Sequence, residues 1–225
     1  MLLASFPAGP WQTNCYLVAS ADDAPLVVVD PGVQALDPIE RFVADKGVAV
    51  AGVLLTHGHI DHVASAADVA DRWGVPAWLH PAERELLSDA GPILPSSLNL
   101  ARELGVDLRE PADLRPLADG ESVEVGGLTF GVRWAPGHRP GCVLLSLPTP
   151  EGETLLFTGD VLFAGSIGRT DLPGGDPDAM AATLRDVVLS LPDDWAVLPG
   201  HGPDTTIGAE RATNPFLKAP TGGIR

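Results

Sequence analysis

The sequence predicts an α/β protein with two β-sheets packed back to back and helices on the outside. Two observations support this fold class. Short apolar runs typical of strands are followed by helical patterns, and this order occurs twice along the chain. The length of 225 residues suits one large domain with a substantial core and is short for two. We therefore expect residues 1–225 to form a single domain.

The first predicted sheet draws on short runs rich in valine and leucine. Its expected strands are Asn14–Ala19, Leu26–Asp30, Val53–Leu55 and Ala77–Leu79. One helix should be capped by Asp37, with Pro38 at its first position, and should end at Gly47. A second is expected over Val63–Trp73, and Gly74 suits its left-handed end. A third helix should start at Pro81.

The second predicted sheet follows a different kind of segment. Residues 88–120 are broken by prolines and weakly periodic, which is typical of a functional loop or a connector with short helices. The strands expected after it are Ser122–Val125, Leu128–Trp134, Val143–Leu147, Leu155–Thr158 and Ala196–Leu198. Asp176 and Pro177 indicate the start of a helix that runs to about Leu189.

Composition excludes several functions. Fourteen basic against thirty acidic residues leave a net charge of -16 without any Lys/Arg run, so no nucleic-acid partner is expected. No apolar stretch approaches the roughly 20 residues that span a bilayer, so no membrane partner is expected either. The first residues lack the basic region of a secretion signal, and Cys15 and Cys142 are expected to be buried thiols. These features favour a cytoplasmic protein of unknown oligomeric state.

The stretch "HGHIDH" places three of the six histidines within six positions. It lies between a predicted strand and a predicted helix, where side chains from a loop and a helix start can converge. Imidazole and carboxylate groups at this spacing suit a divalent metal such as zinc, whereas a chance cluster on a polar loop is the plainer alternative.

Three later turns repeat one pattern. "APGH", "FTGD" and "LPGH" each place a histidine or an aspartate directly after a glycine at the end of a predicted strand. With the first cluster they supply seven candidate metal ligands: His57, His59, Asp61, His62, His138, Asp160 and His201. A single zinc usually takes about four ligands. Two metal ions bridged by one carboxylate would use all seven.

These motifs resemble those of the metallo-β-lactamase superfamily, and within it the glyoxalase II-like hydrolases. "TNCYLV", "VVDPG" and "GSIGRTDLPGGD" extend the resemblance over nearly the whole chain. The resemblance implies a four-layer αββα sandwich. It implies one ion held by His57, His59 and His138, and a second held by Asp61, His62 and His201, with Asp160 bridging. The expected cofactors are therefore two divalent ions, zinc first, with iron or manganese as alternatives.

The chain departs from glyoxalase II in its carrier-binding residues. It stops within about 25 residues of His201, where glyoxalase II has a helical domain that holds glutathione. Its only lysines are Lys46 and Lys218, and its only tyrosine is Tyr16. The usual glutathione-binding side chains thus have no counterparts. We therefore expect a small acyl thioester or related ester as substrate, with little selectivity for the carrier thiol.

Two classes of function remain open. The first is a dinuclear metal hydrolase, with Asp61 and Asp160 as catalytic carboxylates. The second is a mononuclear iron persulfide dioxygenase, which the resemblance permits through His57, His138 and Asp160. A zinc-stabilised scaffold is a weaker, non-enzymatic alternative.

Four further polar residues have expected structural roles. His80 should mark a helix entry rather than bind metal. Asp30 either orients a ligand histidine or belongs to a simple turn. Arg169 and Asp171 are expected to form an ion pair that pins the loop after Asp160.

Overall fold

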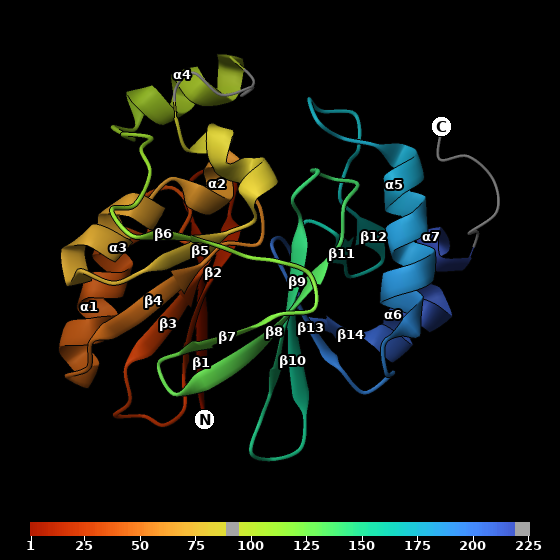
Figure 1. Cartoon of the computed structure of the whole chain (residues 1–225), viewed down its shortest axis with the longest axis horizontal. Coiled ribbons are helices and arrows are strands. Elements are labelled where there is room, and N and C mark those ends of the chain that lie inside the picture. The colour runs from red at the N-terminus through yellow and green to blue at the C-terminus, as the bar shows by residue number, and fades with distance from the viewer. Residues whose placement is uncertain (89–94, 219–225) are drawn as a thin grey trace. The chain divides into compact units, whose positions relative to one another are not determined.

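The structure, a computed structural model of the chain, describes residues 1–88 and 95–218 (Figure 1). Its contacts divide the chain into two compact units. The first comprises Met1–Leu117 with Glu124–Thr129, and the second comprises Ala118–Val123 with Phe130–Arg225. Each unit has its own mixed β-sheet and its own apolar core. That residues 1–225 act as a single domain stays a prediction.

The sheet of the first unit has six strands in the order β1-β2-β3-β4-β5-β6. They are β1 (Leu2–Ala8), β2 (Thr13–Ala19), β3 (Leu26–Val29), β4 (Val50–Leu54), β5 (Ala77–Leu79) and β6 (Leu114–Pro116). The first three strands pair antiparallel, and β3 to β6 pair parallel. All four side chains of β3 are buried, as expected for a central strand that is apolar throughout.

The helices of the first unit agree with the predicted positions but differ in detail. They are α1 (Leu36–Lys46), α2 (Ile60–Val63), α3 (Ala66–Trp73), the 3₁₀ helix η1 (Pro81–Leu87) and α4 (Pro95–Glu103). Gly47 and Gly74 end α1 and α3, as predicted, and both are in the left-handed conformation expected for Gly74. The predicted cap at Asp37 is wrong, because the N-cap is Ala35 and Asp37 lies in the first turn.

The single helix predicted over Val63–Trp73 is also wrong, since α2 and α3 are separate. Ser65 lies between them, and its hydroxyl donates to the Gly32 carbonyl oxygen at 2.7 Å and accepts from the Ala35 N–H at 3.1 Å. The Ser65 N–H donates to the Pro31 carbonyl oxygen at 3.0 Å. These bonds to the loop after β3 replace helical bonds and interrupt the helix.

The second sheet, most of whose residues belong to the second unit, has the order β14-β13-β10-β9-β8-β7. Its strands are β7 (Ser122–Val125), β8 (Leu128–Trp134), β9 (Val143–Pro148), β10 (Thr154–Gly159), β13 (Ala196–Pro199) and β14 (Thr205–Thr206). A separate hairpin, β11 (Leu162–Phe163) and β12 (Ser166–Ile167), follows β10. All five strands predicted for this sheet are present: two match fully and three are longer by one or two residues. Strands β10 and β13 are parallel neighbours.

The helices of the second unit lie together beside its sheet (Figure 1). They are α5 (Pro177–Ala182), the π-helical turn η2 (Thr183–Val187), the 3₁₀ turn η3 (Val188–Ser190), α6 (Ile207–Thr213) and α7 (Pro215–Lys218). Asp176 caps α5 as predicted, because its side chain accepts from the N–H groups of Asp178 and Ala179. The helical path from α5 through η3 ends at Ser190, close to the expected Leu189.

The proline-broken segment contains two elements, α4 and β6, within residues 88–120. Residues 89–94 lie outside the described part of the chain, so the expectation for the first residues of this segment stays untested. In the described residues, Cys15 and Cys142 are buried thiols outside any disulfide, as predicted. No helix among those residues has both the length and the apolar character needed to cross a membrane.

Candidate metal centre

The "HGHIDH" residues occupy the connection between β4 and α2 in the first unit. His59 is the residue before α2, and Asp61 and His62 lie within it. Gly58 packs closely against η1, because a Cβ there would lie 2.9 Å from Leu86 Cδ1 and 3.0 Å from Glu83 Cβ. The Gly58 N–H donates to Glu83 Oε2 at 3.1 Å. The buried carboxylate of η1 therefore holds the backbone between the first two histidines.

Asp30 organises the histidines of this unit. It follows β3 in the left-handed region, with φ of 50°, and is buried. Its Oδ1 accepts from the Thr56 N–H at 2.8 Å, and its Oδ2 accepts from Thr56 Oγ1 at 2.6 Å. His62 Nδ1 lies 2.9 Å from the same Oδ2. Since a carboxylate only accepts, Nδ1 of His62 carries the proton and Nε2 carries the lone pair.

The same logic extends to His57. Thr56 Oγ1 has donated its hydrogen to Asp30 and lies 3.1 Å from His57 Nδ1. The hydroxyl oxygen therefore accepts from the Nδ1–H of His57, which leaves the lone pair on its Nε2. One buried carboxylate thus sets the tautomers of two rings. This is how metal-binding histidines are commonly oriented.

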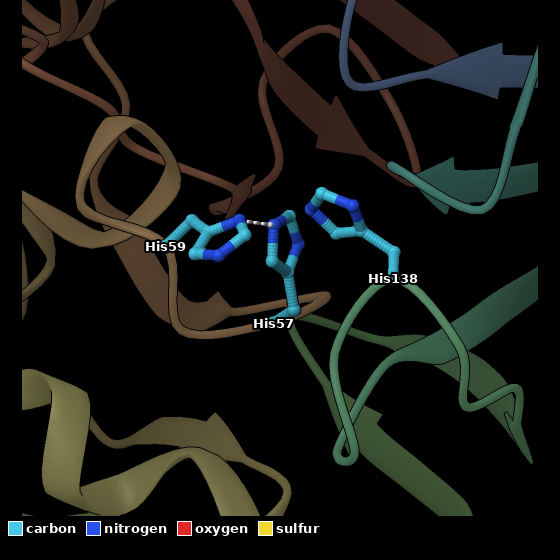
Figure 2. A group of neighbouring side chains, drawn as sticks. All are labelled: His57, His59 and His138. Carbon is cyan, nitrogen blue, oxygen red and sulfur yellow. Dashed lines mark hydrogen bonds between the residues drawn. The ribbon is translucent and has the colours of Figure 1, made fainter. Parts of the chain in front are cut away.

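The Nε2 atoms of both rings lie close to further donor atoms of this unit. His57 Nε2 is 3.2 Å from His59 Nδ1, the contact drawn as a dashed line in Figure 2. His62 Nε2 is 3.6 Å from Asp61 Oδ2, which also accepts from Thr13 Oγ1 at 3.0 Å. The histidine–aspartate distance exceeds that of a hydrogen bond.

The second unit contains His138, Asp160 and His201. His138 lies in the loop after β8 (Figure 2), Asp160 directly follows β10, and His201 comes shortly after β13. Because β10 and β13 are parallel, their carboxyl ends meet at one edge of the sheet. Asp160 Oδ2 lies 3.6 Å from His138 Nε2 and 3.7 Å from His201 Nε2. One carboxylate oxygen therefore faces two imidazole nitrogens.

The loop after β12 orients His138. Its Nδ1 lies 2.7 Å from the carbonyl oxygen of Arg169, so Nδ1 donates and Nε2 carries the lone pair. At Gly168 a Cβ would collide with the Asp160 carbonyl oxygen and lie 3.1 Å from His138 Nδ1. Only glycine fits between these two residues.

An ion pair closes the same loop. Arg169 Nε and Nη2 donate to the two carboxylate oxygens of Asp171, each at 2.7 Å, as predicted from the "GRTD" stretch. The hydrogen bonds from Arg169 lower the pKa of Asp171 to about 2. Both side chains are exposed, so the pair contributes little to stability at moderate salt.

The donor sets of both units suit a divalent metal ion. Zinc binds imidazole nitrogen at about 2.0–2.1 Å and carboxylate oxygen at about 2.0–2.2 Å, so two ligands of one tetrahedral ion lie roughly 3.4 Å apart. The nitrogen–nitrogen and nitrogen–oxygen separations within the units are 3.2, 3.6, 3.6 and 3.7 Å. Small movements of these side chains would let the paired groups within each unit bind the same ion.

Several residues around the donors were not singled out from the sequence. They are Thr13, Thr56, Glu83 and Gly168. By contrast, His80 has the expected helix-entry role, since its Nδ1 accepts from the Ala82 N–H at 3.2 Å as the N-cap of η1. Burial lowers the pKa of His80, and the Glu83 carboxylate opposes that shift.

Comparison with known proteins extends these observations. A model of the metallo-beta-lactamase superfamily matches residues 8–201. The hydroxyacylglutathione hydrolase GloC of Haemophilus influenzae is 34% identical over 219 residues, which cover 97% of this chain and 99% of GloC.

Solved structures agree over almost the full length. BLEG-1, described as a B3 metallo-beta-lactamase, is 39% identical with a TM-score of 0.82 and covers 97% of this chain and 100% of its own. TTHA1623, solved in a di-iron-bound form, is 38% identical with a TM-score of 0.76 and covers 96% and 100%. These matches confirm the predicted α/β class with two mixed sheets and helices. Because the family model spans most of the sequence, the chain belongs to the metallo-beta-lactamase superfamily.

Proposed function

We propose that the seven donors hold two divalent metal ions. His57, His59 and His138 would bind one ion, Asp61, His62 and His201 the other, and Asp160 would bridge them. The observation that carries the proposal is the orientation of three rings, those of His57, His62 and His138. In each ring Nδ1 faces an oxygen atom that accepts its hydrogen bond, and Nε2 lies near another candidate metal ligand. The di-iron-bound state of TTHA1623, 38% identical, supports two ions. Zinc is the first expectation, with iron or manganese as alternatives.

The proposed activity is hydrolysis of a small acyl thioester. The similarity to GloC supports this reaction class. Bound metal ions would polarise the carbonyl group and lower the pKa of a water molecule to about 7. Asp61 and Asp160 are the proposed catalytic carboxylates. Asp61, held by Thr13 Oγ1, would accept a proton from the attacking water, while Asp160 would balance the charge of both ions.

The carrier thiol of the substrate is proposed to be variable. Remote binding energy normally positions the reacting carbonyl, and the sequence offers only two lysines and one tyrosine for contacts to glutathione. We therefore expect hydrolysis of several acyl thiols. For the glutathione thioester, kcat/KM should lie well below the diffusional ceiling of about 10⁸ to 10⁹ M⁻¹s⁻¹.

Metal analysis tests the ligand assignment. Protein loaded with excess zinc should contain two ions per chain. Asp160→Asn should lower occupancy at both sites, because an amide cannot balance two cations, whereas His201→Ala should empty mainly one. Saturation of the wild type at one ion, or equal loss in both variants, would contradict the assignment.

A substrate panel tests the reaction. Lactoyl thioesters of glutathione and of two unrelated thiols should all be hydrolysed. Glutathione-selective turnover near the diffusional ceiling would overturn the proposed carrier tolerance. One bound iron together with oxygen uptake on a persulfide, without hydrolysis, would establish the dioxygenase instead. Turnover of a β-lactam with none of the thioesters would also refute the thioesterase.

A further inference from the structure

Glu210 in α6 is a buried carboxyl group outside the proposed ligand set. Its Oε1 accepts from Thr205 Oγ1 at 2.8 Å. Its Oε2 accepts from the Gly165 N–H and from Asn214 Nδ2, both at 2.8 Å. Gly165 belongs to the tip of the β11–β12 hairpin. Glu210 therefore ties that hairpin to the segment after His201.

Asn214, directly after α6, is fully buried and holds the other side of the same hairpin. Its Nδ2 donates to the Ser166 carbonyl oxygen at 3.0 Å, besides its bond to Glu210. Its Oδ1 accepts from the Phe216 N–H at 3.0 Å at the start of α7. Both side chains thus satisfy backbone groups that the short hairpin leaves unpaired.

The hairpin is connected to two proposed metal ligands. It starts two residues after Asp160, and Thr158 Oγ1 donates to the Leu162 carbonyl oxygen at 2.8 Å across that residue. Phe163 meets the His201 ring edge-to-face, with centroids 6.1 Å apart and an interplanar angle of 78°. A shift of the hairpin would therefore move the surroundings of both ligands.

We propose that Glu210 and Asn214 are positioning residues that set the orientation of His201 through the β11–β12 hairpin and Phe163. The metal-binding consequence rests on the proposed function, because it requires Asp160 and His201 to be ligands. The effect on the orientation of the His201 ring does not depend on the proposed function. Glu210 acts through hydrogen-bond geometry, since all three of its partners donate to it.

Two substitutions at Glu210 separate geometry from charge. Glu210→Ala leaves the Gly165 N–H and Asn214 Nδ2 without their acceptor. Glu210→Gln can keep its amide oxygen towards these two N–H donors and direct its NH₂ group towards Thr205. The Thr205 hydroxyl oxygen would then accept a hydrogen bond instead of donating one. The alanine variant should therefore disturb the hairpin, and the glutamine variant should preserve it.

Arg211→Ala is the matched control on the same helix. Arg211 donates to Asp193 Oδ1 at 2.6 Å and to the carbonyl oxygens of Leu189 and Leu191 at 2.9 and 2.8 Å. It thus anchors α6 with as many hydrogen bonds as Glu210 makes, but none of them goes to the hairpin. Phe163→Leu is a second test, which removes the ring contact and retains the Glu210 network.

The experiment records the imidazole nitrogen and carbon NMR signals of His201 in metal-free protein, then measures zinc affinity by competition with a chromogenic chelator. Glu210→Ala and Phe163→Leu should shift the His201 signals and weaken binding at one of two zinc sites about tenfold, the lower end for residues that orient ligands. Glu210→Gln and Arg211→Ala should do neither.

Unchanged His201 signals in Glu210→Ala, or equal shifts in Arg211→Ala, would overturn the positioning role. If Glu210→Ala fails to fold, Asn214→Ala, which removes the hydrogen bond to the Ser166 carbonyl oxygen of the hairpin, decides the question by the same signals. Wild-type protein that binds none of zinc, iron and manganese would refute the proposed function, while the metal-free spectra would still decide the role of Glu210.

Discussion

Replacing Asp30 by asparagine should invert the tautomers of two histidines at once. Asparagine tolerates the left-handed backbone at this position, so the fold should persist. If the amide oxygen keeps the Thr56 N–H bond, the NH₂ group takes the place of Oδ2. It then faces His62 Nδ1 and Thr56 Oγ1, which must both become acceptors.

Both rings then present the wrong nitrogen to a metal ion. His62 has to carry its proton on Nε2. The Thr56 hydroxyl, now an acceptor from the amide, turns its hydrogen towards His57 Nδ1, and His57 also shifts its proton to Nε2. Loss of such an orienting group costs about 10–100-fold in metal affinity, which corresponds to about 1.4–2.7 kcal/mol per site. The two proposed sites should weaken together.

The measurement combines nitrogen NMR of the histidine rings in metal-free protein with zinc titration against a chelator. Asp113→Asn is the control, because it removes one carboxylate of the same unit in an exposed ion pair with Arg115. It should leave both readouts unchanged. Wild-type zinc affinity in Asp30→Asn, with the proton still on Nδ1 of His62, would refute the reasoning.

Three further predictions follow from individual contacts. Glu83→Ala removes the acceptor of the buried Gly58 N–H and should destabilise the fold by about 1–3 kcal/mol in urea unfolding, whereas Glu83→Gln should restore most of it; equal losses would disprove the hydrogen-bond role. Gly168→Ala should lower the Tm and displace the His138 ring signals, because its Cβ collides with the Asp160 carbonyl oxygen; an unchanged Tm would contradict this packing. Burial, followed by the charge of Asp30, raises the pKa of the Cys15 thiol. The buried thiol of Cys15 therefore makes its full contribution to stability below the unfolded thiol pKa of about 8.5, and this contribution falls at higher pH. Above that pH the wild type should lose stability relative to Cys15→Ala, and parallel curves of stability against pH would exclude the effect.

Much of the secondary structure was predictable because its signals are local. Runs of valine and leucine mark β3 and β4, and Gly47 and Gly74 mark helix ends. Strand β1 was missed, since it contains Pro7 and one of its exposed positions is the apolar Leu3, so its sequence does not alternate between apolar and polar residues. Strands β6 and β14 have three and two residues and exist through pairing with their neighbours, which no local pattern reveals.

The candidate ligands were also predictable from the sequence, because each histidine or aspartate lies in a short motif beside a strand end. Their orientation was not. Asp30 reaches Thr56 and His62 across 26 and 32 positions, and the carbonyl group that orients His138 belongs to Arg169, 31 positions away. Every residue has a backbone carbonyl group, so the sequence does not reveal which of them accepts this hydrogen bond. The sequence therefore determined which donors are present, while the tertiary structure decided which nitrogen each ring presents, because tautomers depend on contacts formed only when distant segments fold together.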